Sequence, residues 1–336
     1  MAGKSGRTIS IDKKLTIKDL LLSREGLMVI LLIAVIIFCK GISDVYTFKN
    51  VLREMPKYLC EIFLLFPMAF LLLMGEIDIS VGSIVCLCGT IAVLTSNAGM
   101  AFPMVILITV LTGVVCGAFN GAMTVCFREL PTMIITLGTQ IIFRGIAELA
   151  LGDGGSASVA NTEGFKALST KIGPFPILFF IILLLGALFI FITNKTVFGR
   201  SLYAIGSNSR TAHYSGIKVN QVLFISFVTM GVFAALSALF LTGCTYGANT
   251  QTGKNFEMDA IAMAVFGGIS NMGGKGNLIG GFVAAFIIVC LRVGLGQINL
   301  NAQIILIIIG LLLIGAVLIP NISAAISAKK KKAAQS

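Results

Sequence analysis

The sequence has no tryptophan, one histidine and five tyrosines among its 336 residues. A histidine-based metal site is excluded because His213 has no second imidazole to act with it. Charged residues are also scarce, at 12%, against about 25% in average soluble proteins. Hydrophobic residues make up 57% of the chain. This balance excludes an ordinary soluble domain and predicts an integral membrane protein.

Motifs for binding cofactors are missing as well. The eight cysteines form no CxxC pair and lie in or beside apolar runs, which favours small core residues over metal ligands or disulfides. The nearest approach to a nucleotide-binding loop is Gly273–Gly276, but Ile269 stands where its first glycine belongs, and Gly276 replaces the Ser or Thr that binds Mg²⁺. We expect no cofactor and no metal on this chain, so that any ATP would be bound by a partner ATPase.

Positive charge is concentrated in three places, although the net charge of +11 belongs to the whole chain. The basic residues cluster in the first 24 residues, in the segment 194–220 and at Lys329–Lys332. This distribution is typical of cytoplasmic segments under the positive-inside rule rather than of a nucleic-acid surface. We therefore expect residues 1–26 to be a cytoplasmic N-terminus, 27–319 a transmembrane domain and 320–336 a cytoplasmic tail. No A-x-A-like site follows the first apolar run, so we expect it to be a retained span and not a cleaved signal.

Apolar runs predict an all-α, polytopic transmembrane helical bundle of about ten spans. An even number agrees with two cytoplasmic termini, and the resulting topology places sixteen basic residues inside and seven outside. The segment 152–173 is the main external loop, and 194–220 is the longest cytoplasmic one. The predicted spans are residues 27–46, 58–74, 82–95, 102–127, 131–151, 174–193, 221–242, 257–269, 277–297 and 302–319.

The stretch Gly75–Ser83, with the sequence GEIDISVGS, places two carboxylates between long apolar runs. Gly75 and Gly82 lower the cost of unwinding a membrane helix there. A charge at the bilayer centre costs about 2.5–3.5 kcal/mol, so we expect these carboxylates to face water, a cavity or a partner. The residues predicted to line a translocation pathway are Glu76, Asp78, Ser80, Ser83, Asn120, Glu257 and Asp259.

A second acidic pair suggests internal symmetry. Glu76 and Asp78 follow the second predicted span, and Glu257 and Asp259 follow the seventh, which is its counterpart in a division into five plus five spans. Such a division gives the halves opposite orientations, as in transporters built from inverted repeats. Chance recurrence of two acids one residue apart is the alternative.

Small and charged residues within the spans allow two further predictions. Gly113, Gly117 and Gly121 lie one turn apart, which is typical of close helix packing, and Asn120 beside them could hydrogen-bond across the contact. Arg144 and Glu148 are separated by four residues. We interpret them as a self-neutralising pair near the membrane surface rather than a substrate contact.

The stretch around Asp78 resembles the G-I-D-L-S-V-G-S motif of ABC-transporter permeases of the ribose, xylose and arabinose type. The resemblance covers roughly residues 58–318, and Glu76 departs from it, because family members carry a small residue there. Four further segments resemble the family in the same order along the chain: Asn120-Gly121; Thr136–Thr139 with Arg144-Gly145; Tyr203–Asn208 with Ser215–Ile217; and Glu257–Ala262 with Gly267-Gly268 and Gly273–Gly276.

This resemblance implies a multi-pass subunit in the inner (cytoplasmic) membrane that catalyses no bond chemistry itself. It implies three kinds of partner: a second permease, identical or different, two ATP-binding-cassette subunits and a soluble substrate-binding protein. The imported solute would be a monosaccharide or a similar small polar molecule, moved by alternating access. With few aromatic residues for stacking on sugars, we expect selectivity to reside mainly in the binding protein. Alternatives are nucleosides or a sugar-derived signal as cargo, and an ion-coupled secondary transporter whose acidic residues carry protons.

The segment 194–220 is predicted to dock into the ATPase. Two glycines bracket residues 207–215, a length suited to a short helix with one exposed face that carries charge and an aromatic ring. The alternative is an ordinary basic loop that only fixes orientation. The residues predicted to form the coupling contact are Gly206, Asn208, Arg210, His213, Tyr214, Ser215 and Gly216.

Overall fold

The computed structural model describes residues 24–298, 303–305, 307–308, 310–311 and 314. The predicted tail 320–336 lies outside this part of the chain, and so do most of the N-terminal segment 1–26 and of the tenth span, 302–319.

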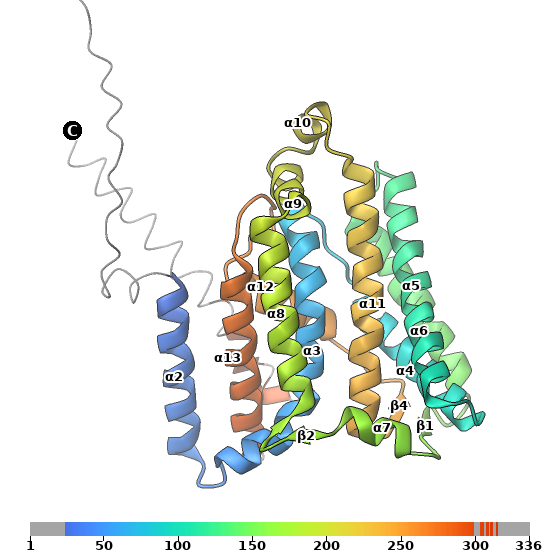
Figure 1. The fold of residues 1–336 in the computed structure, drawn as a ribbon, viewed down its shortest axis with the longest axis vertical. Coiled ribbons are helices and arrows are strands. Elements are labelled where there is room, and N and C mark those ends of the chain that lie inside the picture. Colours follow the sequence, from blue (N-terminus) through green and yellow to red (C-terminus); the bar gives the residue numbers. More distant parts are fainter. Residues whose placement is uncertain (1–23, 299–302, 306, 309, 312–313, 315–336) are drawn as a thin grey trace, which may run out of the picture.

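Long helices run side by side along one direction, as Figure 1 shows. Six of the described helices are long and apolar enough to cross a membrane, and shorter apolar helices occur at Met28–Ile42 and Val81–Asn97. The helices are α2 (Arg24–Ile42), α3 (Phe48–Met74), α4 (Val81–Asn97), α5 (Phe102–Cys126), α6 (Thr132–Leu151), α7 (Glu163–Leu168), α8 (Ile177–Lys195), α9 (Val197–Ser207), α10 (Ser209–Tyr214), α11 (Val219–Thr245), α12 (Phe256–Phe266) and α13 (Leu278–Gln297).

The all-α prediction needs one small correction, because two short antiparallel strand pairs occur at one end of the bundle (Figure 1). β1 (Ser156–Ser158) pairs with β4 (Gly247–Asn249), and β2 (Lys171–Ile172) pairs with β3 (Phe175–Pro176). These pairs satisfy the hydrogen bonds of backbone N–H and C=O groups in the loops between the helices. The pairing of β1 with β4 also ties the loop before α7 to the segment that follows α11.

Helix α3 forms the centre of the bundle, and its side chains from Leu59 to Leu73 are buried. It packs against α8, α9, α11, α12 and α13. The helix is longer than the predicted span 58–74, because it already begins at Phe48. Thr47 caps it by accepting a hydrogen bond from the Asn50 N–H, and Val51, Leu52 and Met55 give its first turns a buried face.

The glycines of α5 lie against α11. A Cβ atom added to Gly113 or Gly117 would collide with the α11 backbone at Gly231 or Phe227, whereas one on Gly121 would press against the side chains of Phe224 and Phe227. The absence of side chains at these positions therefore lets the two helix backbones approach closely.

Candidate functional site

The predicted break between α3 and α4 is built around a buried carboxylate. Helix α3 ends at Met74, the next residue, Gly75, adopts a left-handed conformation (φ 82°), and α4 begins at Val81. Asp78 between them is fully buried, and its Oδ1 accepts hydrogen bonds from the Ser80 N–H at 2.8 Å and the Ser80 hydroxyl at 2.7 Å. The Asn120 side chain of α5 donates to the Ser80 hydroxyl at 2.7 Å. We call Asp78, Ser80 and Asn120 the polar centre.

The polar centre retains unused hydrogen-bonding capacity. Asp78 Oδ2 and Asn120 Oδ1 are buried without a partner among the described residues, and so is the hydroxyl of Ser83 one turn into α4. Buried polar groups in proteins are nearly always hydrogen-bonded, so unpartnered ones call for a ligand, water or ion. Two of these three atoms are acceptors only, which suits a ligand rich in O–H or N–H donors.

The helices are interrupted a second time between α11 and α12, and this non-helical segment packs against the start of α4, which follows the first interruption between α3 and α4. Helix α11 ends at Thr245, the next residue, Tyr246, is also left-handed (φ 51°), and α12 begins only at Phe256. Gly82 in the first turn of α4 faces this segment, because an added Cβ would collide with the Gly253 carbonyl and the Glu257 carboxylate. Glu257 is 5% exposed, and its Oε2 has no partner among the described residues. The fold therefore brings Glu257 beside the start of α4.

Helix α6 supplies hydrogen bonds to both interruptions. The Thr136 hydroxyl accepts from the Ile79 N–H at 3.2 Å, and Arg144 Nη1 donates to the carbonyls of Thr250 and Thr252 at 3.0 and 2.8 Å. Non-helical backbone at membrane depth needs such partners. Our interpretation of Arg144 as the ion-pair partner of Glu148 was wrong, since the ion pairs of the described residues do not include this one.

Glu76 lies at the edge of this region rather than in the polar centre. The hydroxyl of Thr132, at the start of α6, donates to its carboxylate. Together they line a cavity of about 240 Å³ whose walls include Thr124 near the end of α5 and Arg128 and Glu129 from the α5–α6 turn. Glu76 thus faces a polar cavity, unlike Asp78, which is enclosed.

Asp259 is two residues from Glu257 in sequence but belongs to a different cluster. Its Oδ1 pairs with Nη2 of Arg292 on α13, and Arg292 Nη1 contacts both carboxylate oxygens of Glu61 on α3 at 2.8 Å. The guanidinium also lies 6.0 Å from the centre of the Tyr58 ring. We call Glu61, Asp259 and Arg292 the buried triad. The sequence analysis did not predict that these three residues pair. The available signal was a charged residue within each of two apolar runs, Glu61 in α3 and Arg292 in α13.

The predicted coupling segment forms two short helices, α9 and α10. Asn208 caps α10 by accepting a hydrogen bond from the Thr211 N–H at 2.9 Å. Ala212 is buried, whereas Arg210, His213 and Ser215 are exposed and Tyr214 is 88% exposed. Gly216 follows in a left-handed conformation (φ 86°). Helix α10 projects beyond the ends of the long helices (Figure 1).

Gly206 has a different role from its neighbours in α10. A Cβ atom there would collide with the Leu73 carbonyl at the end of α3 and with the Gly274 N–H. The Gly274 N–H itself donates to the Leu73 carbonyl at 2.8 Å, and the Tyr203 hydroxyl donates to the Gly276 carbonyl at 3.0 Å. The glycine-rich turn before α13 is therefore packed under α9.

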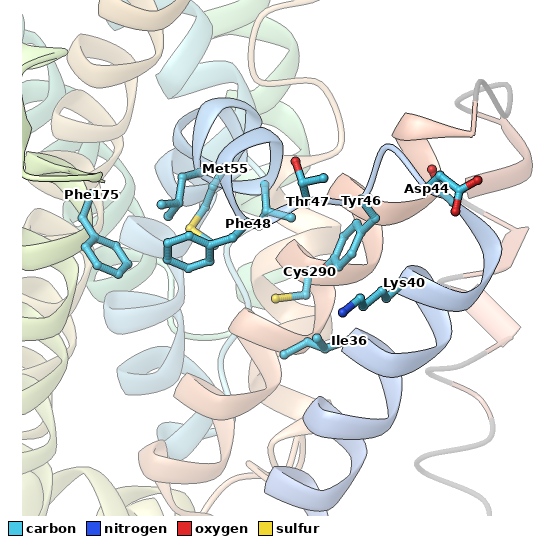
Figure 2. Close-up of a pocket in the computed structure, with 12 residues that line it drawn as sticks. Ile36, Lys40, Asp44, Tyr46, Thr47, Phe48, Met55, Phe175 and Cys290 are labelled. Atoms are coloured by element: carbon cyan, nitrogen blue, oxygen red, sulfur yellow. The ribbon is translucent and has the colours of Figure 1, made fainter.

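A separate apolar groove of about 610 Å³ lies between α2, the start of α3, β3 and α13. Figure 2 shows Phe48, Phe175 and Cys290 on its walls, with Lys40 and Asp44 at its polar edge. It contains none of the predicted pathway residues.

Comparison with known proteins identifies the family. Residues 61–317 match the family model described as a branched-chain amino acid transport system permease component. The autoinducer 2 import system permease protein LsrD of Salmonella typhimurium (strain LT2) is 31% identical over 273 residues, which cover 79% of this chain and 81% of that protein. LsrC of Photorhabdus laumondii is 38% identical over 235 residues, or 69% of each chain.

Among solved structures, an inward-facing conformation of a transporter assigned to the metal-chelate ABC type matches with a TM-score of 0.50. The match covers 90% of this chain and 98% of the other at 12% identity, so it bears on the fold alone. The family match and the relatives confirm the resemblance seen in the sequence motifs. The chain therefore belongs to the family of membrane permease components of ATP-binding-cassette importers.

Proposed function

We propose that this chain is the subunit through which an importer moves a monosaccharide or a similar small polar solute, with a sugar-derived signal of the autoinducer 2 kind as the first candidate. The names of the similar permeases support this choice of solute. The observation that carries the proposal is the polar centre, whose buried acceptors lack partners in the part of the chain that the structure describes. Hydroxyl groups of a sugar-like solute would donate to such acceptors.

The solute pathway passes the place where the two interruptions meet. Asp78 and Asn120 offer acceptors there, and Glu257 approaches from the other half of the chain. Glu76 faces the cavity beside the α5–α6 turn and acts at the cytoplasmic end of the same route. Asp259 differs from these residues, because its carboxylate is paired with Arg292 in the buried triad. The residues assigned to the pathway are Glu76, Asp78, Ser80, Ser83, Asn120 and Glu257.

The chain crosses the inner membrane ten times as an inverted repeat of five plus five spans. Two observations support the repeat: α3 and α11 each have 27 residues, and each is followed by a left-handed residue and a non-helical segment. They end at opposite ends of the bundle (Figure 1). In this topology residues 1–26 and 320–336 are cytoplasmic. A reporter fused after Lys332 should be active on the cytoplasmic side, and activity on the external side would contradict the topology.

The importer contains a second permease, a binding protein on the external side and two ATPase subunits that hold the ATP and hydrolyse it. Helix α10, with Arg210, His213 and Tyr214 exposed, docks into the ATPase. Approach of the two ATPases then shifts the long helices, and the contact between Gly82 and Gly253 opens first toward the binding protein and afterwards inward. This chain binds no cofactor and contributes only the path.

Reconstitution tests this function. The permease, its ATPase and its binding protein are placed in liposomes, and uptake of labelled autoinducer 2, ribose and a nucleoside is measured with and without ATP. We expect uptake of a sugar-like solute that requires both ATP and the binding protein. Uptake by the permease alone, driven by an ion gradient, would contradict the proposal and identify a secondary transporter.

A further inference from the structure

The buried triad is a cluster of charge that the pathway does not use. Arg292 joins two carboxylates from different helices, Glu61 on α3 and Asp259 on α12. The side chains of Arg292 and Glu61 are 10% and 5% exposed, and that of Asp259 is 9% exposed. A buried ion pair is weak support for stability, because well-packed apolar residues often serve as well or better. We therefore look for the role of the triad in the helices that it holds in place.

The triad holds the first turn of α12. This helix has only 11 residues, and both Glu257 and Asp259 lie in its first turn. Residues two apart on a helix point about 200° apart, so they face different neighbours. Fixing Asp259 on Arg292 therefore fixes the direction in which Glu257 points, which is toward Gly82 at the start of α4.

Arg292 is suited to this task because its guanidinium is a rigid planar fork. Nη1 donates a hydrogen bond to Glu61 and Nη2 donates one to Asp259, so the two carboxylates are held at a defined separation and angle. The anchor on the Glu61 side is α3, the central helix, whose middle is buried on all sides. The short helix α12 is thus tied to the most buried of the long helices.

We propose that Arg292 is a positioning residue that holds α12, and through it Glu257, against α4 until the ATPases act. This inference rests on the proposed transport function. The contact between Glu257 and Gly82 closes the path, and the triad couples its opening to movement of α3 and α13. Without the triad, α12 samples the open arrangement independently of ATP and of the binding protein.

The first test replaces the fork but keeps the charge. Arg292→Lys and the matched control Arg53→Lys, at the exposed pair with Glu54 on α3, are each assembled with the ATPase and the binding protein. We expect Arg292→Lys to assemble normally while ATP hydrolysis without the binding protein rises about 5-fold or more and uptake falls by a similar factor. The control should match the wild type in both measurements. Wild-type coupling in Arg292→Lys would overturn the proposal.

A second variant separates positioning from folding. The triple change Glu61→Gln, Asp259→Asn and Arg292→Met removes all three charges, so no buried charge is left unpaired. We expect its melting temperature to exceed that of Arg292→Met alone while coupling stays defective. Wild-type coupling in the triple variant, or failure of both this variant and Arg292→Lys to fold, would assign the triad to folding alone and overturn the inference.

Failure of this inference can be distinguished from failure of the proposed function. If the wild-type importer shows no ATP-dependent uptake, the proposed function itself fails. If the wild type transports normally and the triad variants do as well, only the role of Arg292 fails.

Discussion

The polar centre and the buried triad both place carboxylates inside an apolar bundle, but they stabilise them in opposite ways. Asp78 is held by the uncharged donors of Ser80, and its second oxygen has no partner among the described residues. Glu61 is held by Arg292, whose Nη1 contacts both of its oxygens.

This difference makes the polar centre suited to binding a solute and the buried triad suited to holding helices in place. A carboxylate with spare acceptors and neutral neighbours can exchange partners with a passing solute at little cost. A carboxylate paired with a buried guanidinium cannot, because removing one partner of a buried pair leaves an uncompensated charge and costs about 3–5 kcal/mol. The polar centre is therefore suited to the pathway, and the triad to fixing the helices around it.

The largest expected effect comes from breaking the triad. Arg292→Met leaves two buried carboxylates without their cation, so the permease should lose about 3–5 kcal/mol of stability. The measurement is the yield of monodisperse protein and its apparent melting temperature in detergent. A melting temperature equal to that of the wild type would show that water or another cation already compensates these carboxylates.

A smaller effect is expected from Gly82→Ala, which pushes the two interruptions apart. The new methyl group would collide with the Gly253 carbonyl and the Glu257 carboxylate, and overpacking of this kind typically costs about 1–3 kcal/mol. The matched control is Gly138→Ala on α6, where an added Cβ meets nothing within 4 Å. The control should be neutral or slightly stabilising. Equal melting temperatures for the two variants would contradict the close contact.

A still smaller effect on stability is expected from Asp78→Asn. The amide oxygen can accept the same two hydrogen bonds from Ser80, so the free energy of unfolding should change by no more than about 1 kcal/mol. The melting temperature should therefore change by less than Gly82→Ala changes it. Asp78→Leu, which leaves both Ser80 donors unpaired, should cost about 1–3 kcal/mol. An equally large loss of stability in both variants would show that the charge itself, as in the triad, holds the polar centre together.

The smallest effect on stability is expected at α10, where the charged side chains are exposed. Arg210→Glu with His213→Glu should leave the free energy of unfolding within about 0.5 kcal/mol of the wild type. Co-purification of the ATPase and substrate-stimulated ATP hydrolysis should nevertheless be lost. A double variant that keeps its partner and normal transport would make the segment 194–220 an orientation signal only.

The interruption after α3 could be predicted from sequence because its signals are local. Two glycines and two carboxylates within an apolar run leave few other structures at membrane depth, and the break follows Met74 as expected. The helix around Ser209–Tyr214 was predictable for the same reason, since its length and its flanking glycines are read directly from the chain.

Partnerships across the bundle could not be predicted in this way. Glu61 and Arg292 are 231 residues apart, and nothing in either apolar run identifies the other. Arg144 was assigned to a neighbour one turn away, whereas its carbonyl acceptors lie 106 and 108 residues further along. Such contacts depend on how α3, α6, α12 and α13 pack, which hydrophobic periodicity alone does not determine.

The central claim is that the polar centre lies on the solute path of an ATP-driven importer, and Asp78→Asn tests it most directly. ATP-driven uptake is measured in liposomes that contain the permease, the ATPase and the binding protein, with Gly138→Ala as the control. We expect Asp78→Asn to assemble and hydrolyse ATP like the wild type but to take up solute about 10-fold more slowly, which is the effect of losing about 1.4 kcal/mol in one contact. Unchanged uptake by this variant would contradict the claim.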